Sequence, residues 1–166
     1  MSAYVFTHAT VLDGTEAMEP QPNMTVVVNE GVIEAVGSAA TTVPPMGARE
    51  IDLAGAYLMP GLVNLHVHLC GSGRPTSAGA AGELIDKVVG NPVGRWYLRR
   101  TLRASAQQQL ASGVTTVRSV GDPGFADVEV RDAINAGKYP GPRLVTSGVG
   151  VTVPGGHGAG LFAHVA

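Results

Sequence analysis

A ten-residue stretch, Met59 to His68, constrains this chain more than any other. It reads Met-Pro-Gly-Leu-Val-Asn-Leu-His-Val-His, so a Pro-Gly turn leads into a short apolar run with two histidines near its end. Side chains i and i+2 of a β-strand point to the same face. His66 and His68 can therefore converge on one divalent metal ion, which satisfies both ring nitrogens. The alternative is a pair of interior histidines held by hydrogen bonds, because a His-x-His pair alone is a weak signal.

The composition favours a globular protein that acts on small molecules. Hydrophobic residues make up 45% of the 166 residues and charged residues 14%, while 23 Gly and 11 Pro indicate many tight turns, as in α/β or β-rich folds. A formal net charge of −2 without a Lys/Arg block argues against nucleic acid or a membrane surface as the main partner. The single cysteine, Cys70, excludes an internal disulfide and is either a neighbour of the histidine pair or an inert small side chain.

No segment marks the chain for a membrane or for export. No stretch approaches the ~20 apolar residues of a membrane span, and the amino terminus lacks a basic region followed by an apolar one. A cytoplasmic location is the expectation.

The first 58 residues predict a small antiparallel β domain. Short β-rich runs alternate with turns such as Asp13-Gly14 and Glu30-Gly31, and the runs cover residues 4–12, 24–29, 32–36, 50–53 and 56–58. Pro44 and Pro45 exclude a central strand between them because each removes a ladder donor. A domain this short is expected to pack against the rest of the chain.

From residue 59 the pattern changes to alternating strands and helices. Asn91-Pro92 predicts a helix start and Gly113 its end, with apolar residues at helical intervals between them: Trp96, Leu98, Leu102, Ala106 and Leu110. Residues 114–120 predict a strand covered on both faces, 127–136 a second helix and 143–150 a third strand. This order is typical of βαβ units in a parallel sheet. The small polar residues 71–82 form either a mobile active-site loop or a plain surface loop.

In these features the chain resembles the amidohydrolase superfamily of metal-dependent hydrolases, in particular the imidazolonepropionase-like and Xaa-Pro dipeptidase branch. The resemblance rests on residues 60–68, 113–118, 137–144 and 154–158, which correspond to barrel strands 1 to 3 and their flanks. It departs at Asn64, where the family often has Asp. The resemblance implies a β-sandwich over residues 1–58 and the first three β/α units of a TIM-type (β/α)8 barrel over residues 59–166.

Such a barrel takes ~250 residues, so residues 59–166 account for only part of one. The resemblance leads us to expect a carboxylated lysine on strand 4, histidines on strands 5 and 6 and an aspartate on strand 8, and none of these strands falls within this sequence. We therefore expect an N-terminal portion that is inactive alone. Its open sheet should associate, either as a homo-oligomer or with a complementing C-terminal chain.

The resemblance also implies roles for particular residues in hydrolysis of amide or peptide C–N bonds. His66 and His68 would hold the more buried ion of a binuclear metal pair, most simply zinc. His157 would stabilise the developing negative charge on the substrate carbonyl oxygen, or is a surface loop histidine. Arg118 would bind a substrate carboxylate, or forms a structural ion pair. The competing interpretation is a non-catalytic remnant or partner subunit that associates through its open sheet.

Overall fold

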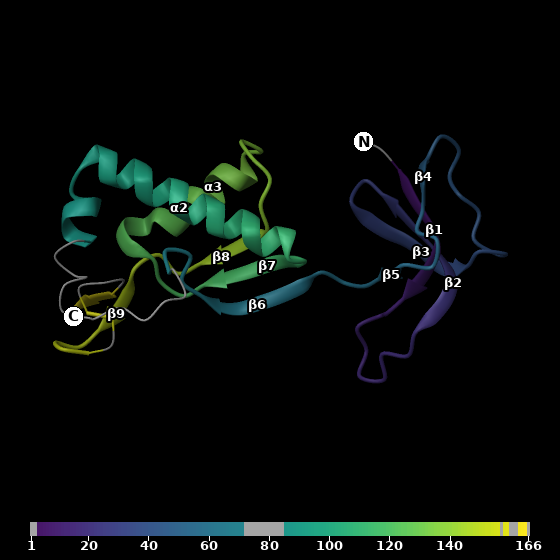
Figure 1. Cartoon of the computed structure of the whole chain (residues 1–166), viewed down its shortest axis with the longest axis horizontal. Coiled ribbons are helices and arrows are strands. Elements are labelled where there is room, and N and C mark those ends of the chain that lie inside the picture. Colours follow the sequence, from purple (N-terminus) through teal and green to yellow (C-terminus); the bar gives the residue numbers. More distant parts are fainter. Residues whose placement is uncertain (1–2, 72–84, 157, 160–162, 166) are drawn as a thin grey trace. The chain divides into compact units, whose positions relative to one another are not determined.

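The computed structural model describes residues 3–71, 85–156, 158–159 and 163–165 (Figure 1). The chain divides into two compact units, Met1–Pro60 and Gly61–Ala166, a division two residues beyond the predicted one. Among the described helices, none combines the length and the apolar character that a membrane span requires.

The first unit is one mixed β-sheet. Its strands are β1 (Tyr4–Val11), β2 (Gln21–Asn29), β3 (Val32–Ser38), β4 (Arg49–Asp52) and β5 (Tyr57–Leu58). The antiparallel pairing of β2 with β1 and β3 confirms the predicted hairpin. Ala9, Val11 and Val26 form the centre of a small core, onto which Phe6 and Leu58 pack.

The prediction of an antiparallel domain is wrong for the rest of this unit, which is a mixed sheet. Strands β4 and β5 both run parallel to β1, and the five strands form one continuous hydrogen-bonded sheet. Parallel neighbours require a crossover connection. Residues 39–48, with Pro44 and Pro45, supply a connection long enough to bring β4 to the free edge of β1 in the same direction.

The second unit is a three-stranded parallel sheet with two helices. Strands β6 (Leu62–Val67), β7 (Val114–Ser119) and β8 (Arg143–Thr146) are neighbours in that order. Helix α2 (Pro92–Ala111) connects β6 to β7, and α3 (Ala126–Asn135) connects β7 to β8 after the short 3-10 helix η1 (Pro123–Phe125). Both helices lie on one face of the sheet (Figure 1). The predicted βαβ order is confirmed.

Local signals set the ends of α2 as predicted. The Asn91 side chain accepts a hydrogen bond from the Gly94 N–H at 2.8 Å, and Pro92 occupies the first turn. Gly113 follows the helix with a φ of 89°, a conformation that glycine adopts readily. Leu102 and Ala106 are fully buried. Trp96, predicted on the same apolar stripe, is instead 57% exposed.

Among the described residues, the helices cover one face of the sheet and nothing covers the other, whereas the sequence predicted that β7 is covered on both faces. Val117 and Ser119 are buried beneath the helices, whereas Arg118 between them is exposed. On β8, Leu144 is likewise buried and Val145 exposed. The alternation arises because no described segment packs on the second face.

The predicted third strand is also too long, since β8 ends at Thr146. Gly148 has a φ of 73°, and a Cβ built on it would lie 2.6 Å from the Phe125 ring. The chain therefore turns there, in a conformation and a space that favour glycine. Two short strands follow, β9 (Gly150–Thr152) and β10 (Ala163–Val165), which pair in parallel with each other.

Candidate metal centre

The two predicted metal ligands lie side by side at the carboxyl end of β6. His66 is in the strand and His68 follows its last residue. Their ring centroids are 5.7 Å apart, with the ring planes at 78°. The pairing of β6 with β7 is irregular between Asn64 and Val67, and such bulges re-aim side chains near functional sites. The structure thus brings together the two imidazoles that the spacing suggested.

A backbone carbonyl fixes the tautomer of His68. Nδ1 of His68 lies 2.6 Å from the carbonyl oxygen of Gly121, which can only accept a hydrogen bond, so Nδ1 carries the proton and donates. The lone pair of the neutral ring is then on Nε2. A histidine that binds a metal through one ring nitrogen commonly donates the other N–H to a carbonyl or a carboxylate.

Asn64 ties this strand to helix α2. Its side-chain oxygen accepts a hydrogen bond from the His66 N–H at 3.2 Å, and its amide nitrogen donates to the Gln109 side chain at 3.3 Å. An amide can accept and donate at once, which an ionised aspartate cannot. Asn64, at a position where the family often has Asp, therefore makes a pair of hydrogen bonds that an ionised aspartate could not make.

A buried carboxylate, which the sequence reasoning missed, holds the turn after His68. Asp122 is fully buried and accepts hydrogen bonds from the N–H groups of Leu69 at 3.1 Å and Cys70 at 2.8 Å. It also accepts one from the Ser119 hydroxyl at 2.8 Å. Asp122 stands between a glycine and a proline, so its sequence context indicated only a turn. Its three donors compensate the cost of burying a charge.

A second buried carboxylate joins α3 to the segment after β8. Asp127 accepts hydrogen bonds from the N–H groups of Val128 at 2.9 Å and Gly148 at 3.2 Å. Burial raises the pKa of Asp127, and the nearby charge of Asp122 raises it further. Together, Asp122 and Asp127 tie the carboxyl ends of the three parallel strands to one another.

Cys70 has the character of an inert core residue. Burial raises the pKa of its thiol far above the ordinary range, and the charge of Asp122 acts in the same direction. The thiol therefore stays protonated at neutral pH, where metal binding and nucleophilic attack need the thiolate.

Arg118 reaches the backbone beside the histidine pair. Its Nε donates to the carbonyl oxygen of Leu65 at 2.6 Å, while the side chain remains exposed. Among the described residues it has no acidic partner, so the predicted alternative of a structural ion pair is not seen there. His157, the remaining predicted site residue, lies outside the described residues.

The donor set fits part of a metal site. Two imidazoles suit Zn²⁺ and related ions, but zinc sites in proteins use three or four protein ligands. Within the described ranges, no group of three His, Cys, Asp or Glu side chains is placed to hold a metal ion.

Comparisons with known proteins agree on one family. The sequence profile of the Amidohydrolase family matches residues 57–162. Imidazolonepropionase from Salinispora arenicola is 29% identical over 136 residues, which are 80% of this chain and 29% of that protein. A putative prolidase from Bifidobacterium longum, known from its crystal structure, superposes with a TM-score of 0.74 at 34% identity, over 98% of this chain and 34% of that one.

A Xaa-Pro dipeptidase crystallised with methionine in its active site gives a TM-score of 0.73 at 25% identity, over 94% of this chain and 36% of that one. The chain therefore spans about a third of the length of the relatives it matches.

Proposed function

This chain belongs to the amidohydrolase family, and we propose that it carries the two-histidine part of a metal site that hydrolyses amide or peptide C–N bonds. One observation carries the proposal. The rings of His66 and His68 meet at the carboxyl end of a parallel strand, with centroids 5.7 Å apart. In β/α barrels that end of the sheet is where active sites are built.

The proposed ligands are Nε2 of His68 and a ring nitrogen of His66. The Gly121 carbonyl orients the first of these by holding the proton on Nδ1. The other ligands of a binuclear zinc centre would come from outside the described residues. When bound, such a metal supplies Lewis acidity that activates water and polarises the substrate carbonyl.

Two further residues contribute to the proposed reaction from the chain itself. The Arg118 guanidinium binds a substrate carboxylate, a role supported by its exposed position beside the backbone of β6. His157 donates a hydrogen bond to the carbonyl oxygen as negative charge develops there. The proposed substrate is a small amide or a dipeptide, a choice supported by the prolidase-like solved structures.

Cobalt binding tests the ligand assignment, because Co²⁺ reports its coordination by visible absorption. We expect the purified chain to bind Co²⁺ weakly, and His66→Gln or His68→Gln to abolish the absorption band. His8→Gln is the matched control, since His8 is exposed in the first unit and pairs with Asp52. Binding that is unchanged in both His66→Gln and His68→Gln would contradict the assignment.

A second candidate function is that of a non-catalytic partner subunit. The observation that favours it is the exposed apolar surface of β6, an edge strand in the described sheet, where Leu62, Val63 and Leu65 are at least half exposed. Metal analysis of the native assembly separates the two functions. About two ions per assembly support the hydrolase, whereas an assembly without metal supports the partner subunit.

A further inference from the structure

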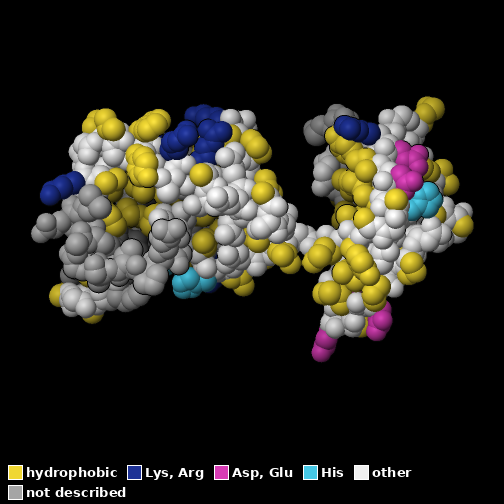
Figure 2. Space-filling model, viewed as in Figure 1, with side chains coloured by type: hydrophobic (Ala, Val, Ile, Leu, Met, Phe, Trp, Pro, Cys, Tyr) yellow, Lys and Arg dark blue, Asp and Glu magenta, His cyan; other side chains and the backbone are white. Residues whose placement is uncertain are grey.

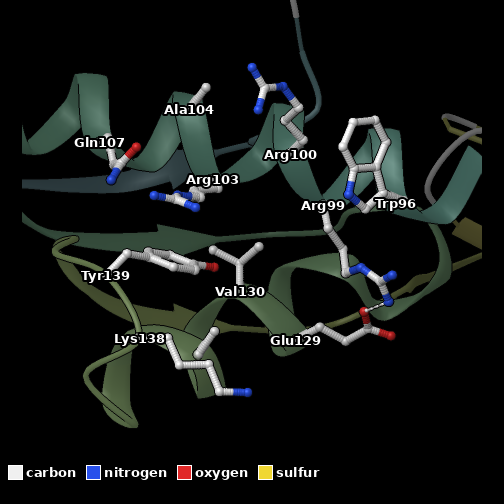
Figure 3. A pocket seen from close by; sticks show the side chains of 11 residues that line it. Trp96, Arg99, Arg100, Arg103, Ala104, Gln107, Glu129, Val130, Lys138 and Tyr139 are labelled. Atoms are coloured by element: carbon white, nitrogen blue, oxygen red, sulfur yellow. Dashed lines mark hydrogen bonds and ion pairs between the residues drawn. The ribbon is translucent and has the colours of Figure 1, made fainter.

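A basic groove lies on the solvent side of the two helices, away from the histidine pair. It encloses about 630 Å³ between α2 and α3 (Figure 3). Arg99, Arg100 and Arg103 of α2 line one side, and Lys138, which follows α3, lines the other. Figure 2 shows Lys and Arg side chains gathered over the helices of this unit. The metal-site chemistry proposed above uses none of these residues.

The groove carries more positive charge than its own residues neutralise. Among the described residues, Glu129 is the one carboxylate that lines it, and this side chain is shared by Arg95 at 2.6 Å and Arg99 at 2.9 Å. Arg100, Arg103 and Lys138 have no acidic partner in the described part of the chain. Cations gathered in a groove create a positive potential that attracts anionic groups.

Aromatic rings orient part of this charge. The Arg103 guanidinium lies 4.2 Å from the centre of the Tyr139 ring, and the Arg100 guanidinium lies 6.0 Å from the centre of the Trp96 ring. Trp, Tyr and Arg are the residue types that dominate binding energy at protein interfaces. A guanidinium held by an aromatic ring loses less freedom when it binds a carboxylate.

The shape favours an extended chain over a compact small molecule. From Trp96 to Gln107 the lining follows α2 for about 16 Å at 1.5 Å per residue, which is the length of about five extended residues. Pockets for small ligands bury most of the ligand surface. Here Trp96 and Arg100 are both exposed, so the groove is open along its side.

We propose that the α2/α3 groove binds an acidic, extended segment of a partner protein. Its carboxylates pair with Arg100, Arg103 and Lys138, and an apolar side chain of the segment packs on Trp96. This interaction is independent of the metal site and of the hydrolase proposal. It uses the outward side of the helices, whereas the histidine pair lies at the carboxyl end of the sheet.

The chain offers a direct probe, because Trp96 is its single tryptophan. We would titrate the purified chain with a hexaglutamate peptide that ends in leucine and follow both Trp96 fluorescence and the anisotropy of a label on the peptide. The two signals should give the same Kd, and the affinity should fall as salt rises from about 0.05 M to about 0.3 M.

Charge reversals locate the interaction. Arg103→Glu and Lys138→Glu should each weaken binding about fivefold to tenfold, while Arg143→Glu should change it less than about twofold. Arg143 is the matched control because it is an exposed arginine of the same unit outside the groove. Circular dichroism confirms that each variant is folded.

Equal losses in all three variants would overturn the proposal, since they would indicate attraction to the net charge of the unit alone. Peptide binding without a change in Trp96 fluorescence would also overturn it. Equally tight binding of citrate would assign the groove to a small anion rather than to a protein segment, and so would contradict it too.

Discussion

The two faces of the β6–β7–β8 sheet differ in how completely this chain covers them. On the helix side, Leu102, Val117 and Val130 are at most 1% exposed and form one core. On the other side, Arg118 and Val145 face outward without a covering layer among the described residues. The described residues are therefore sufficient for a helix-covered core, but none of them covers the second face of the sheet.

The two faces of the sheet also differ in the kind of residue that they carry. The residues of the helix-covered core are packed and apolar, whereas Arg118, on the bare face, and the neighbouring His66 are exposed and polar. In a closed barrel the face opposite the helices becomes the interior. We infer that the helix-covered face stabilises the fold. The opposite face and the carboxyl-end edge of the sheet carry side chains of the proposed site.

The largest effect on stability should come from the helix-covered face. Leu102→Ala removes a fully buried side chain from the core and should destabilise the second unit by about 2–5 kcal/mol. Val145→Ala, on the bare face, should cost less than about 1 kcal/mol because its side chain is already half exposed. Urea unfolding of both variants measures the comparison, and equal losses would mean that both faces are packed in solution.

The second effect concerns the buried carboxylate below the histidine pair. Asp122→Ala leaves the N–H groups of Leu69 and Cys70 without their acceptor and should cost about 2–3 kcal/mol. Ser119→Ala removes one hydroxyl donor to the same carboxylate and should cost about 1 kcal/mol. Thermal unfolding tests both, and a larger loss in Ser119→Ala would show that Asp122 does not hold this turn.

Asp127 predicts a pH dependence of stability. Its pKa in the folded state is raised above the ordinary value of 3.8, so folding favours its protonated form. The associated stability is complete below pH 3.8 and is lost as pH rises through the raised pKa. Relative to the wild type, Asp127→Asn should therefore become more stable as pH increases across this range.

The Asp127→Asn variant loses one acceptor oxygen. This loss changes the stability of the variant relative to the wild type by the same amount at every pH, so it does not affect the slope of that difference with pH. Asn can still accept the hydrogen bond from the Gly148 N–H. Melting temperatures of both proteins across the acid range measure the slope. A difference that is constant with pH, or that falls as pH rises, would contradict the raised pKa.

These particulars show which features a sequence can reveal. The ends of α2 follow from Asn91, Pro92 and Gly113, because caps and helix stops depend on neighbouring residues. The parallel direction of β4 and β5 cannot be predicted from their own residues, because strand direction depends on the path of the connecting segment. Trp96 was predicted on the apolar stripe of α2 but lines the outer groove, because it stands two residues before Leu98, which packs on the core, and so lies on nearly the opposite side of the helix.

The site likewise combines a feature that neighbouring residues determine with one that depends on distant segments. The spacing of His66 and His68 predicted that their rings approach each other, because residues two apart share a strand face. Asp122 was missed because the N–H groups that it holds, those of Leu69 and Cys70, are about fifty residues away in sequence, at the turn after β6. Only the folded chain brings that carboxylate to those N–H groups.

The smallest expected signal is hydrolysis by the chain alone. With two imidazoles and no third ligand among the described residues, Zn²⁺ would be weakly held and water poorly positioned. Residues 1–166 should therefore hydrolyse dipeptides at the background rate, measured by amine release with and without zinc. Zinc-dependent turnover that His66→Gln abolishes would show that these residues form a complete site.

Sedimentation velocity tests most directly whether the bare face needs a covering layer. Burial of apolar surface contributes about 25 cal/mol per Å², so a few hundred Å² left exposed favours association by several kcal/mol. We predict that the 17.0 kDa chain sediments as an oligomer, as a complex with a complementing chain or as aggregate. A stable 17.0 kDa monomer with a cooperative melt would contradict this account, because it would show that the second face needs no partner.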